Sequence, residues 1–282
     1  MNLGKLQKPL LLFGGPYSNL EALLALREQA QLLNITPDHI ICTGDIVAYC
    51  GQPYETVECI RDWGIHVLMG NCEESFASDA DDCGCGFGEG SSCDLLSAEW
   101  FQFANKKLTL AQRQWFSELP RKINFTIKNK TVSVVHGSVS EINQFIFPST
   151  DRDKFIKQFQ HSQSDIIVAG HSGIPFTKKI KTESSEHIWH NAGAIGMPAN
   201  DGNTYTWYSV LSPTYDGISF EFHRLHYNYA KAKANMIDAG LNTPYALALE
   251  NGLWPSMDIL PEAERKQQGK DLDISDVSEQ YT

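Results

Sequence analysis

The sequence predicts a mixed α/β sandwich with parallel strands in its first half, and three observations support this fold class. Short apolar runs alternate with helical patterns through the first two thirds of the 282-residue chain. The later apolar runs follow one another at the spacing of hairpins, without intervening helices. The composition, with 42% hydrophobic and 20% charged residues, is typical of a globular protein. Because no apolar run approaches the ~20 residues of a membrane-spanning helix, we expect no membrane insertion.

In the first half of the chain, strands lead into helices through glycine-rich turns. The run at residues 10–13 ends at Gly14 and Gly15, and leucines at helical spacing follow it. Ser18, with Glu21 three residues later, has the pattern of a capping box and is expected to cap that helix. The elements expected here are strands at 10–13, 40–43 and 66–69, and helices after Ser18 and at 54–63.

The second half is predicted to contain helices first and paired strands later. Helices are expected at 95–105, 110–119 and 151–160, a hairpin at 122–135 around Asn129, and strands at 166–169, 176–180, 187–189, 204–211 and 218–225. Helical patterns return at 227–240 and 244–251, and the polar end of the chain is expected to be mobile. The expected division is a main domain at 1–225, a helical extension at 226–261 and a mobile tail at 262–282.

An acidic segment that contains cysteines interrupts this order at residues 73–94. It holds seven acidic residues, no Lys or Arg and several glycines, and is expected to be a long loop insertion at the surface. All seven cysteines of the chain precede residue 94, and their odd number, with no export signal, favours reduced thiols in the cytoplasm. The formal net charge of −11 argues against extended contacts with nucleic acid.

Four polar side chains follow apolar runs, each beside a glycine: Asp45, Asn71, His136 and His171. The carboxyl ends of strands in open α/β sheets form the crevice in which ligands bind, so these side chains are expected to converge. Carboxylate, amide and imidazole groups together suit a divalent transition metal. Taken singly, each of the four is more simply a hydrogen-bonded polar residue at the end of a strand.

Five ordered motifs resemble those of the calcineurin-like metallophosphoesterases. They are Thr43-Gly44-Asp45, Gly70-Asn71-Cys72-Glu73, Val135-His136-Gly137, Gly170-His171-Ser172-Gly173 and Asn191-Ala192-Gly193. The resemblance covers about residues 8–225 and is strongest to the bacterial phosphodiesterase branch. It implies a four-layer α/β/β/α sandwich of two mixed sheets flanked by helices. It also implies two metal ions, bridged by an Asp and a water, that create a nucleophile at neutral pH.

The first metal motif diverges from the pattern of that family. Gly15 and Tyr17 stand where the family motif Asp-x-His-Gly-Asn has its Asp and His, and Gly173 stands where Gly-His-x-His has its second His. The resemblance implies that these positions belong to one metal, whose ligands are lost. It implies that the ligands of the other metal are retained, namely Asp45, Asn71, His136 and His171.

Further roles follow from the same resemblance. Catalytic roles are implied for Asp45, Cys72 and Glu73, the last two near the leaving group. The cofactor is expected to be one or two divalent ions of Zn, Fe or Mn. The residues expected to line the cleft are Gly15, Tyr17, Gly173, His190 and Asn191.

Three functions remain open. The first is a metal-dependent phosphoesterase that hydrolyses a small phosphomonoester or phosphodiester, with one site of the metal pair altered. Substitute ligands for that site could come from Cys83, Cys85, Cys93, Asp81 and Asp82, unless the acidic segment is only a solvated loop. The second is a catalytically silent scaffold of the same fold that binds a protein partner. The third is a thiol-based metal or redox module built on Cys72 and the three cysteines of the acidic segment.

Overall fold

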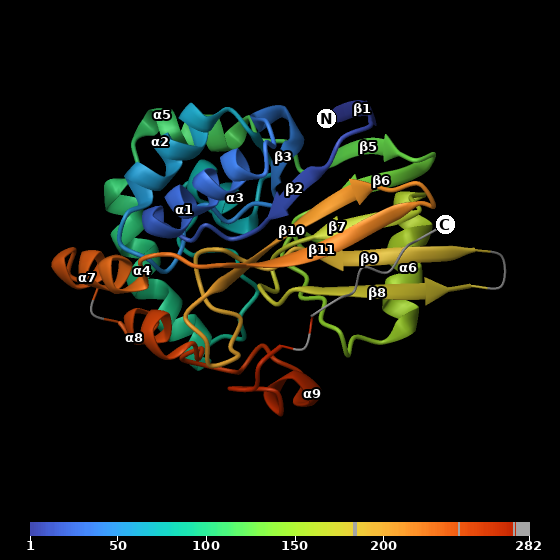
Figure 1. Cartoon of the computed structure of the whole chain (residues 1–282). Coiled ribbons are helices and arrows are strands. Elements are labelled where there is room, and N and C mark those ends of the chain that lie inside the picture. Colours follow the sequence, from blue (N-terminus) through green and yellow to red (C-terminus); the bar gives the residue numbers. More distant parts are fainter. Residues whose placement is uncertain (183–184, 242, 273, 275–282) are drawn as a thin grey trace.

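Two β-sheets packed face to face form the centre of the protein, with helices on the outside of each sheet (Figure 1). The computed structural model describes residues 1–182, 185–241, 243–272 and 274. Each sheet mixes parallel and antiparallel strand pairs. The four-layer α/β/β/α sandwich that the sequence predicts is therefore confirmed.

The strands of each sheet are not in chain order. Within the described residues, one sheet has the order β1 (Asn2–Leu6), β5 (Ile123–Ile127), β6 (Lys130–Val134), β7 (Ile166–Ala169), β9 (Glu186–Asn191) and β8 (Phe176–Lys181). The other has the order β11 (Ile218–Leu225), β10 (Thr206–Pro213), β2 (Leu10–Phe13), β3 (Ile40–Cys42) and β4 (His66–Val67). Strands β2, β3 and β4 are parallel, and so are β6, β7 and β9. Their carboxyl ends carry the loops described below.

Burial on both faces explains the short, wholly apolar strands at the centre of the sheets. Side chains alternate between the two faces of a strand. In β2, Leu10 and Leu12 join the core between the two sheets, whereas Leu11 and Phe13 join the core under the helices. All four side chains are fully buried, so neither face tolerates a polar residue.

Helices cover the outer faces of both sheets (Figure 1). The helices that share a core with the five-stranded sheet are α1 (Leu20–Leu32), α2 (Pro53–Trp63), α3 (Asn71–Ala77), α4 (Ser92–Lys107), α5 (Leu110–Ser117), α7 (Tyr229–Asp238) and α8 (Pro244–Asn251). Helix α6 (Arg152–Ser162) covers the six-stranded sheet, where Phe155 and Phe159 contact Trp189 edge-on. Two short helices are η1 (Pro37–His39) and α9 (Glu262–Arg265). No helix in the described part of the chain has the length and apolar character that crossing a bilayer requires.

Two local features at the start of the chain differ from the sequence prediction. Strand β1 is not predicted, because its side chains are mostly exposed; it pairs in parallel with β5 at the edge of its sheet. Helix α1 is capped by Asn19 and not by Ser18. The side-chain oxygen Oδ1 of Asn19 accepts a hydrogen bond from the backbone amide of Ala22 at 3.1 Å, whereas the Ser18 hydroxyl has no hydrogen-bonding partner among the described residues.

The acidic segment at residues 73–94 is not one long loop, so that prediction is wrong at both ends. Helix α3 already begins at Asn71, and helix α4 begins at Ser92. The acidic residues Glu73, Glu74 and Asp94 lie in the first turns of these helices, where the helix dipole stabilises negative charge. Only residues 78–91 form the connection between the two helices.

The C-terminal segments pack onto the rest of the protein. Met236 of α7 and Leu249 of α8 are fully buried in the core beneath the five-stranded sheet. Glu264 of α9 accepts hydrogen bonds from the backbone amide and hydroxyl of Ser149, at 2.9 and 2.6 Å. The prediction of a mobile tail is therefore wrong for residues 262–272, whereas residues 273 and 275–282 lie outside the described residues.

Candidate metal centre

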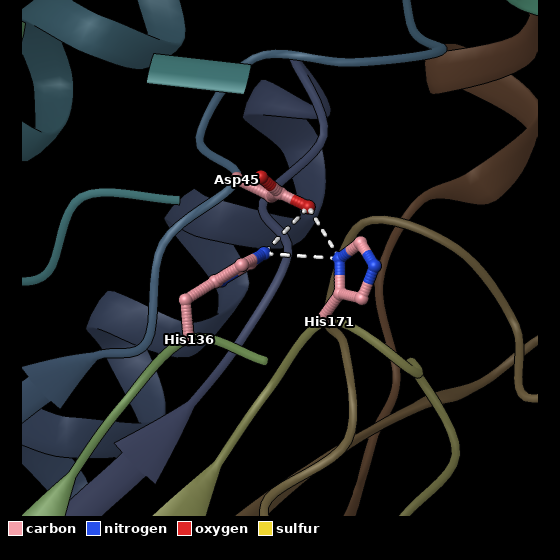
Figure 2. A group of neighbouring side chains, drawn as sticks. All are labelled: Asp45, His136 and His171. Atoms are coloured by element: carbon pink, nitrogen blue, oxygen red, sulfur yellow. Dashed lines mark hydrogen bonds and ion pairs between the residues drawn. The ribbon is translucent and has the colours of Figure 1, made fainter. Parts of the chain in front are cut away.

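The four predicted ligand side chains come from loops at the carboxyl ends of parallel strands in both sheets. Asp45 follows β3 and Asn71 is the first residue of α3, just after β4. His136 follows β6 and His171 follows β7. The structure brings the four together at one edge of the sandwich, and Figure 2 shows Asp45, His136 and His171 pointing toward a common centre.

Close backbone approach makes this convergence possible. Gly44 has φ 101°, and a Cβ there would lie 2.7 Å from the Gly70 amide nitrogen and 2.9 Å from the His136 ring. Only glycine fits such a position. Asp45 and His171 both have φ 56°, a left-handed conformation that is uncommon for residues other than glycine and that clusters at functional sites.

The Nε2 atom of His136 lies within hydrogen-bonding distance of an atom from each of the other three side chains. His136 Nε2 is 3.2 Å from Asp45 Oδ2, 3.0 Å from Asn71 Oδ1 and 3.1 Å from His171 Nδ1. His171 Nδ1 is 3.9 Å from the same Asp45 oxygen. The side chains of Asp45, His136 and His171 are at most 7% exposed, so water cannot solvate them freely.

The oxygen and nitrogen atoms of this cluster can turn lone pairs toward one another, an arrangement that a proton or a metal ion between them would stabilise. His136 Nδ1 is 2.7 Å from the Thr43 carbonyl, which can only accept, so Nδ1 carries the proton and a neutral ring has its lone pair on Nε2. The Asn71 amide nitrogen donates to the Cys83 carbonyl at 2.9 Å, which turns Oδ1 toward His136. Two imidazole nitrogens with two oxygen donors fit a divalent transition metal, and their hydrogen-bonding partners orient them for it.

The pKa shifts of Asp45 and His136 follow the same preference for positive charge, whereas burial lowers the pKa of His171. Burial alone would raise the pKa of Asp45, but the charges and hydrogen bonds of His136 and His171 lower it well below the ordinary range. Burial would likewise lower the pKa of His136, but the Asp45 carboxylate raises it. The carboxylate is therefore ionised and attracts a proton or a cation to the centre.

Glu73 does not face this centre, so its predicted place near a leaving group is wrong. Its carboxylate is fully buried and accepts backbone amides of Gly70, Asp45 and Ile46 at 2.9, 2.7 and 2.8 Å. Burial and the charge of Asp45 raise the pKa of Glu73, while these amides oppose the shift. Glu73 therefore positions the loop of Asp45 rather than touching a reacting atom.

Cys72 is buried next to Asp45 and is not one of the candidate metal ligands. Its backbone amide donates to Asp45 Oδ1 at 3.3 Å, and its side chain is 1% exposed. Burial, followed by the charge of Asp45, raises the pKa of the Cys72 thiol well above its ordinary value. A buried neutral thiol that does not line the pocket described below is placed poorly for proton donation, which contradicts the predicted role.

Tyr17 occupies the place of the missing ligands. A Cβ on Gly15 would lie 2.3 Å from the Tyr17 ring, so the ring covers Gly15. The Tyr17 hydroxyl is 3.7 Å from where a Cβ on Gly173 would lie. One aromatic side chain thus spans both divergent positions. Burial, followed by the charge of Asp45, raises the pKa of Tyr17, which keeps the hydroxyl protonated.

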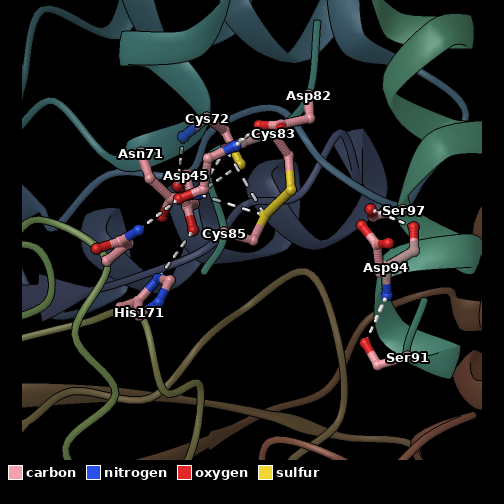
Figure 3. Close-up of a disulfide and its surroundings, with 12 residues drawn as sticks. Asp45, Asn71, Cys72, Asp82, Cys83, Cys85, Ser91, Asp94, Ser97 and His171 are labelled. Atoms are coloured by element: carbon pink, nitrogen blue, oxygen red, sulfur yellow. Dashed lines mark hydrogen bonds and ion pairs between the residues drawn. A yellow bond between two sulfur atoms is a disulfide. The ribbon is translucent and has the colours of Figure 1, made fainter. Parts of the chain in front are cut away.

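The acidic segment does not supply thiolate ligands in this structure. Cys83 and Cys85 form a disulfide beside Asp45 and Asn71 (Figure 3), contrary to the expectation of reduced thiols. Within the described residues, the group able to hold a metal consists of Asp45, His136 and His171. It includes none of the predicted substitute ligands Cys83, Cys85, Cys93, Asp81 and Asp82, so neither the substitute site nor a four-cysteine cluster is formed.

The two residues predicted to line the cleft from strand β9 lie elsewhere. His190 is fully buried among aromatic side chains, and its Nε2 is 2.7 Å from the Ser209 hydroxyl of the other sheet. Asn191 donates to the Gly170 carbonyl at 2.7 Å and the Ser172 hydroxyl at 2.8 Å. Asn191 therefore fixes the loop of His171. His190 and Asn191 do not line the pocket, and neither does Gly15, because Tyr17 covers it.

A pocket of about 670 Å³, counting space open to solvent, lies over Asp45 and His171. Tyr17 and Gly173 line it as predicted. Most of its wall is aromatic or apolar and was not predicted from the sequence: Tyr49, Phe87, Phe145, Met197, Tyr245, Trp254 and Ile259. These residues come from distant segments, so only their aromatic or apolar character could have indicated them.

With this fold and site described, the chain can be placed among known proteins. The sequence profile of the calcineurin-like phosphoesterase superfamily domain matches residues 19–212. The chain therefore belongs to the calcineurin-like phosphoesterase superfamily, as the ordered motifs predict.

Three relatives illustrate the range of similarity. An uncharacterized protein of Methanocaldococcus jannaschii, MJ0912, is 28% identical over 235 residues, covering 78% of this chain and 88% of that protein. A metallophosphoesterase from Sphaerobacter thermophilus superposes with a TM-score of 0.67 at 23% identity, covering 88% of this chain and 100% of its own. The hypothetical protein PH1004 from Pyrococcus horikoshii OT3 superposes with a TM-score of 0.71 at 16% identity, covering 89% and 99%. At these identities, the two solved structures establish the fold.

Proposed function

We propose that this protein is a metal-dependent phosphoesterase that hydrolyses a small phosphomonoester or phosphodiester. The observation that carries the proposal is the convergence of four buried side chains, whose oxygen and nitrogen atoms face one another and suit a divalent cation: Asp45, Asn71, His136 and His171. Membership of the calcineurin-like phosphoesterase superfamily supports the same reaction class.

The residues of the chain divide the work in the proposed reaction. Asp45, Asn71, His136 and His171 would hold a divalent ion, with Zn, Fe and Mn as the candidates. Such an ion lowers the pKa of water and polarises a phosphoryl oxygen. Tyr17 lines the same pocket, and its protonated hydroxyl is proposed to donate a hydrogen bond to a phosphoryl oxygen. Because Tyr17 fills the space at Gly15 and Gly173, we propose one ion rather than two.

The scaffold function makes the opposite prediction about turnover. The scaffold function is favoured by the absence of the usual ligands at Gly15 and Gly173, whose space Tyr17 fills. A protein that only binds a partner would not need those ligands. As the compartment, we propose the cytoplasm, since five of the cysteines are free.

Metal analysis and turnover together test the proposal. Purified protein is loaded with Zn, Fe or Mn and assayed with p-nitrophenyl phosphate and bis(p-nitrophenyl) phosphate. We expect about one ion per chain and metal-dependent release of p-nitrophenol. Asp45→Asn and His136→Ala are expected to lower both metal content and turnover by more than the ~10–100-fold that changes around a ligand cause. His223→Gln, on strand β11 and away from the pocket, serves as the matched control with unchanged turnover. Metal-loaded protein without turnover of either ester would favour the scaffold function.

A further inference from the structure

The pocket over the metal centre has walls that are chemically unlike a site for a highly charged phosphate. Aromatic and apolar side chains dominate it, and among the described residues that line it there is no Lys or Arg. The nearby connection between α3 and α4 adds exposed acidic residues at Asp81, Asp82 and Glu89. A substrate must therefore bury apolar surface there and carry little negative charge.

Charge arithmetic at the centre favours a substrate with one negative charge. A divalent ion beside the Asp45 carboxylate would leave a formal charge of at most +1, because the other three ligand groups are neutral and the buried Glu73 carboxylate nearby can only lower the sum. A phosphodiester carries one negative charge at neutral pH, whereas a phosphomonoester carries nearly two. In a buried, weakly screened pocket, the second charge of a monoester has no basic side chain to meet it.

The aromatic walls are held in place before any ligand binds. The Trp254 indole donates to the Pro198 carbonyl at 2.7 Å, and its backbone amide donates to Asn200 Oδ1 at 2.8 Å. Phe145 stacks on His171 with ring centroids 4.1 Å apart. The held indole and phenyl ring both line the pocket, which gives it aromatic surface suited to a flat group.

A second aromatic wall stands beside Tyr17. The Tyr49 ring lies 4.8 Å from Tyr17 and 4.5 Å from Tyr245 of α8, measured between ring centroids. Tyr245 and Trp254 lie beyond residue 212, where the match to the superfamily domain ends. The segment beyond the matched domain therefore supplies part of the pocket wall.

We propose that this pocket selects a phosphodiester that bears a flat aromatic or similarly apolar group, which packs against the aromatic lining that includes Trp254 and Phe145. The proposal rests on the proposed function, because the phosphoryl group is taken to bind at the metal centre. Trp254 and Phe145 are specificity residues in this proposal, and the bond that breaks remains the phosphoester bond at the centre.

Three unactivated esters, used as ligands and not as substrates, test the proposal through their affinities. Diphenyl phosphate and dimethyl phosphate carry the same single charge and differ only in their aromatic groups, whereas phenyl phosphate keeps a ring and carries the second charge. Affinity for the metal-loaded protein is measured by quenching of tryptophan fluorescence and by inhibition of bis(p-nitrophenyl) phosphate turnover. We expect diphenyl phosphate to bind at least about tenfold more tightly than either comparator, because aromatic burial adds to a matched charge.

Variants of Trp254 test whether the preference for diphenyl phosphate arises in this pocket. Trp254→Ala is expected to reduce the preference for diphenyl over dimethyl phosphate about tenfold, whereas Trp254→Phe, which keeps a ring, retains most of it. Trp115→Phe, in helix α5 and away from the pocket, is the control for fluorescence and should leave both affinities unchanged. Metal content and circular dichroism check that each variant is folded.

The outcomes separate this proposal from the proposed function. Equal affinities for diphenyl and dimethyl phosphate, in protein that turns over bis(p-nitrophenyl) phosphate, would overturn the aromatic subsite and leave the phosphoesterase function intact. Tighter binding of phenyl phosphate than of diphenyl phosphate would overturn the charge argument. Selective binding of diphenyl phosphate without turnover of any ester would retain the subsite and overturn the phosphoesterase function.

Discussion

The Glu73 carboxylate holds together the loop that carries Asp45. It accepts the backbone amides of Gly70, Asp45 and Ile46, and that of Val47 at a longer 3.4 Å. All of these groups are buried. Without the carboxylate the amides would lose their acceptor, and the backbone that aims Asp45 at His136 would lose its anchor.

We predict that Glu73→Ala destabilises the metal-free protein by roughly 3 kcal/mol or more, because each buried donor left unpaired costs ~1–3 kcal/mol. Urea denaturation of the metal-free protein measures the loss. Glu73→Gln, which keeps one acceptor oxygen, should fall between the wild type and the alanine variant. Glu89→Ala removes an exposed acid from the neighbouring connection and should change stability by less than ~0.5 kcal/mol. Equal stabilities for Glu73→Ala and Glu89→Ala would show that water replaces the carboxylate.

At the scale of elements, hydrophobic patterning predicts the interior strands and the long helices well. Strand β11 is found at 218–225 as predicted, and the turn at Lys128 and Asn129 joins β5 to β6. Hydrophobic periodicity does not predict elements, or ends of elements, that are formed by strand pairing or by helix capping. Strand β1 has little apolar character and exists because β5 offers an edge, and α3 begins at Asn71 because Glu73 caps it.

Helix α7 allows a matched test of how firmly the extension belongs to the core. Met236 is fully buried, whereas its neighbour Ile237 is 45% exposed. We predict that Met236→Ala lowers the free energy of unfolding by ~2–5 kcal/mol, because it leaves a cavity in the core shared with the five-stranded sheet. Ile237→Ala should cost less than ~1 kcal/mol. Thermal and urea unfolding measure both. Similar small losses at the two positions would mean that α7 is detached from the domain core in solution.

At the scale of the whole molecule, the sequence predicts the placement of the four ligand residues but not the pocket above them. Asp45, Asn71, His136 and His171 can be found because each follows a buried strand, and parallel strands present their carboxyl ends at one edge. The pocket joins Phe87, Phe145 and Trp254, whose segments meet only after the sandwich has formed. Their convergence is a tertiary property with no local signal in the chain.

The packing of the two sheets against each other predicts a specific dependence of stability on pH. His190 of β9 is fully buried, and within the described residues the hydrogen-bonding partners of its Nδ1 and Nε2 are the hydroxyls of Thr177 and Ser209, at 2.8 and 2.7 Å. Phe220 and Phe222 of β11 flank the ring. Burial lowers the pKa of His190 to about 3. In the unfolded chain the ordinary pKa of a histidine is ~6.5, so the unfolded state binds a proton that the folded state refuses.

The stability contributed by neutral His190 is therefore fully present above pH ~6.5 and declines as the pH falls toward about 3, by up to ~1.4 kcal/mol per pH unit. We predict that the free energy of unfolding of His190→Gln, whose amide can still bond to the two hydroxyls, falls less steeply between pH 6.5 and 4.5 than that of the wild type. The difference in slope should correspond to about one proton fewer taken up on unfolding. Urea denaturation across this range measures the slopes. His161→Gln, at an exposed position on α6 outside the space between the sheets, should follow the wild-type slope. Parallel curves for the wild type and His190→Gln would mean that water reaches the space between the sheets and solvates a charged His190.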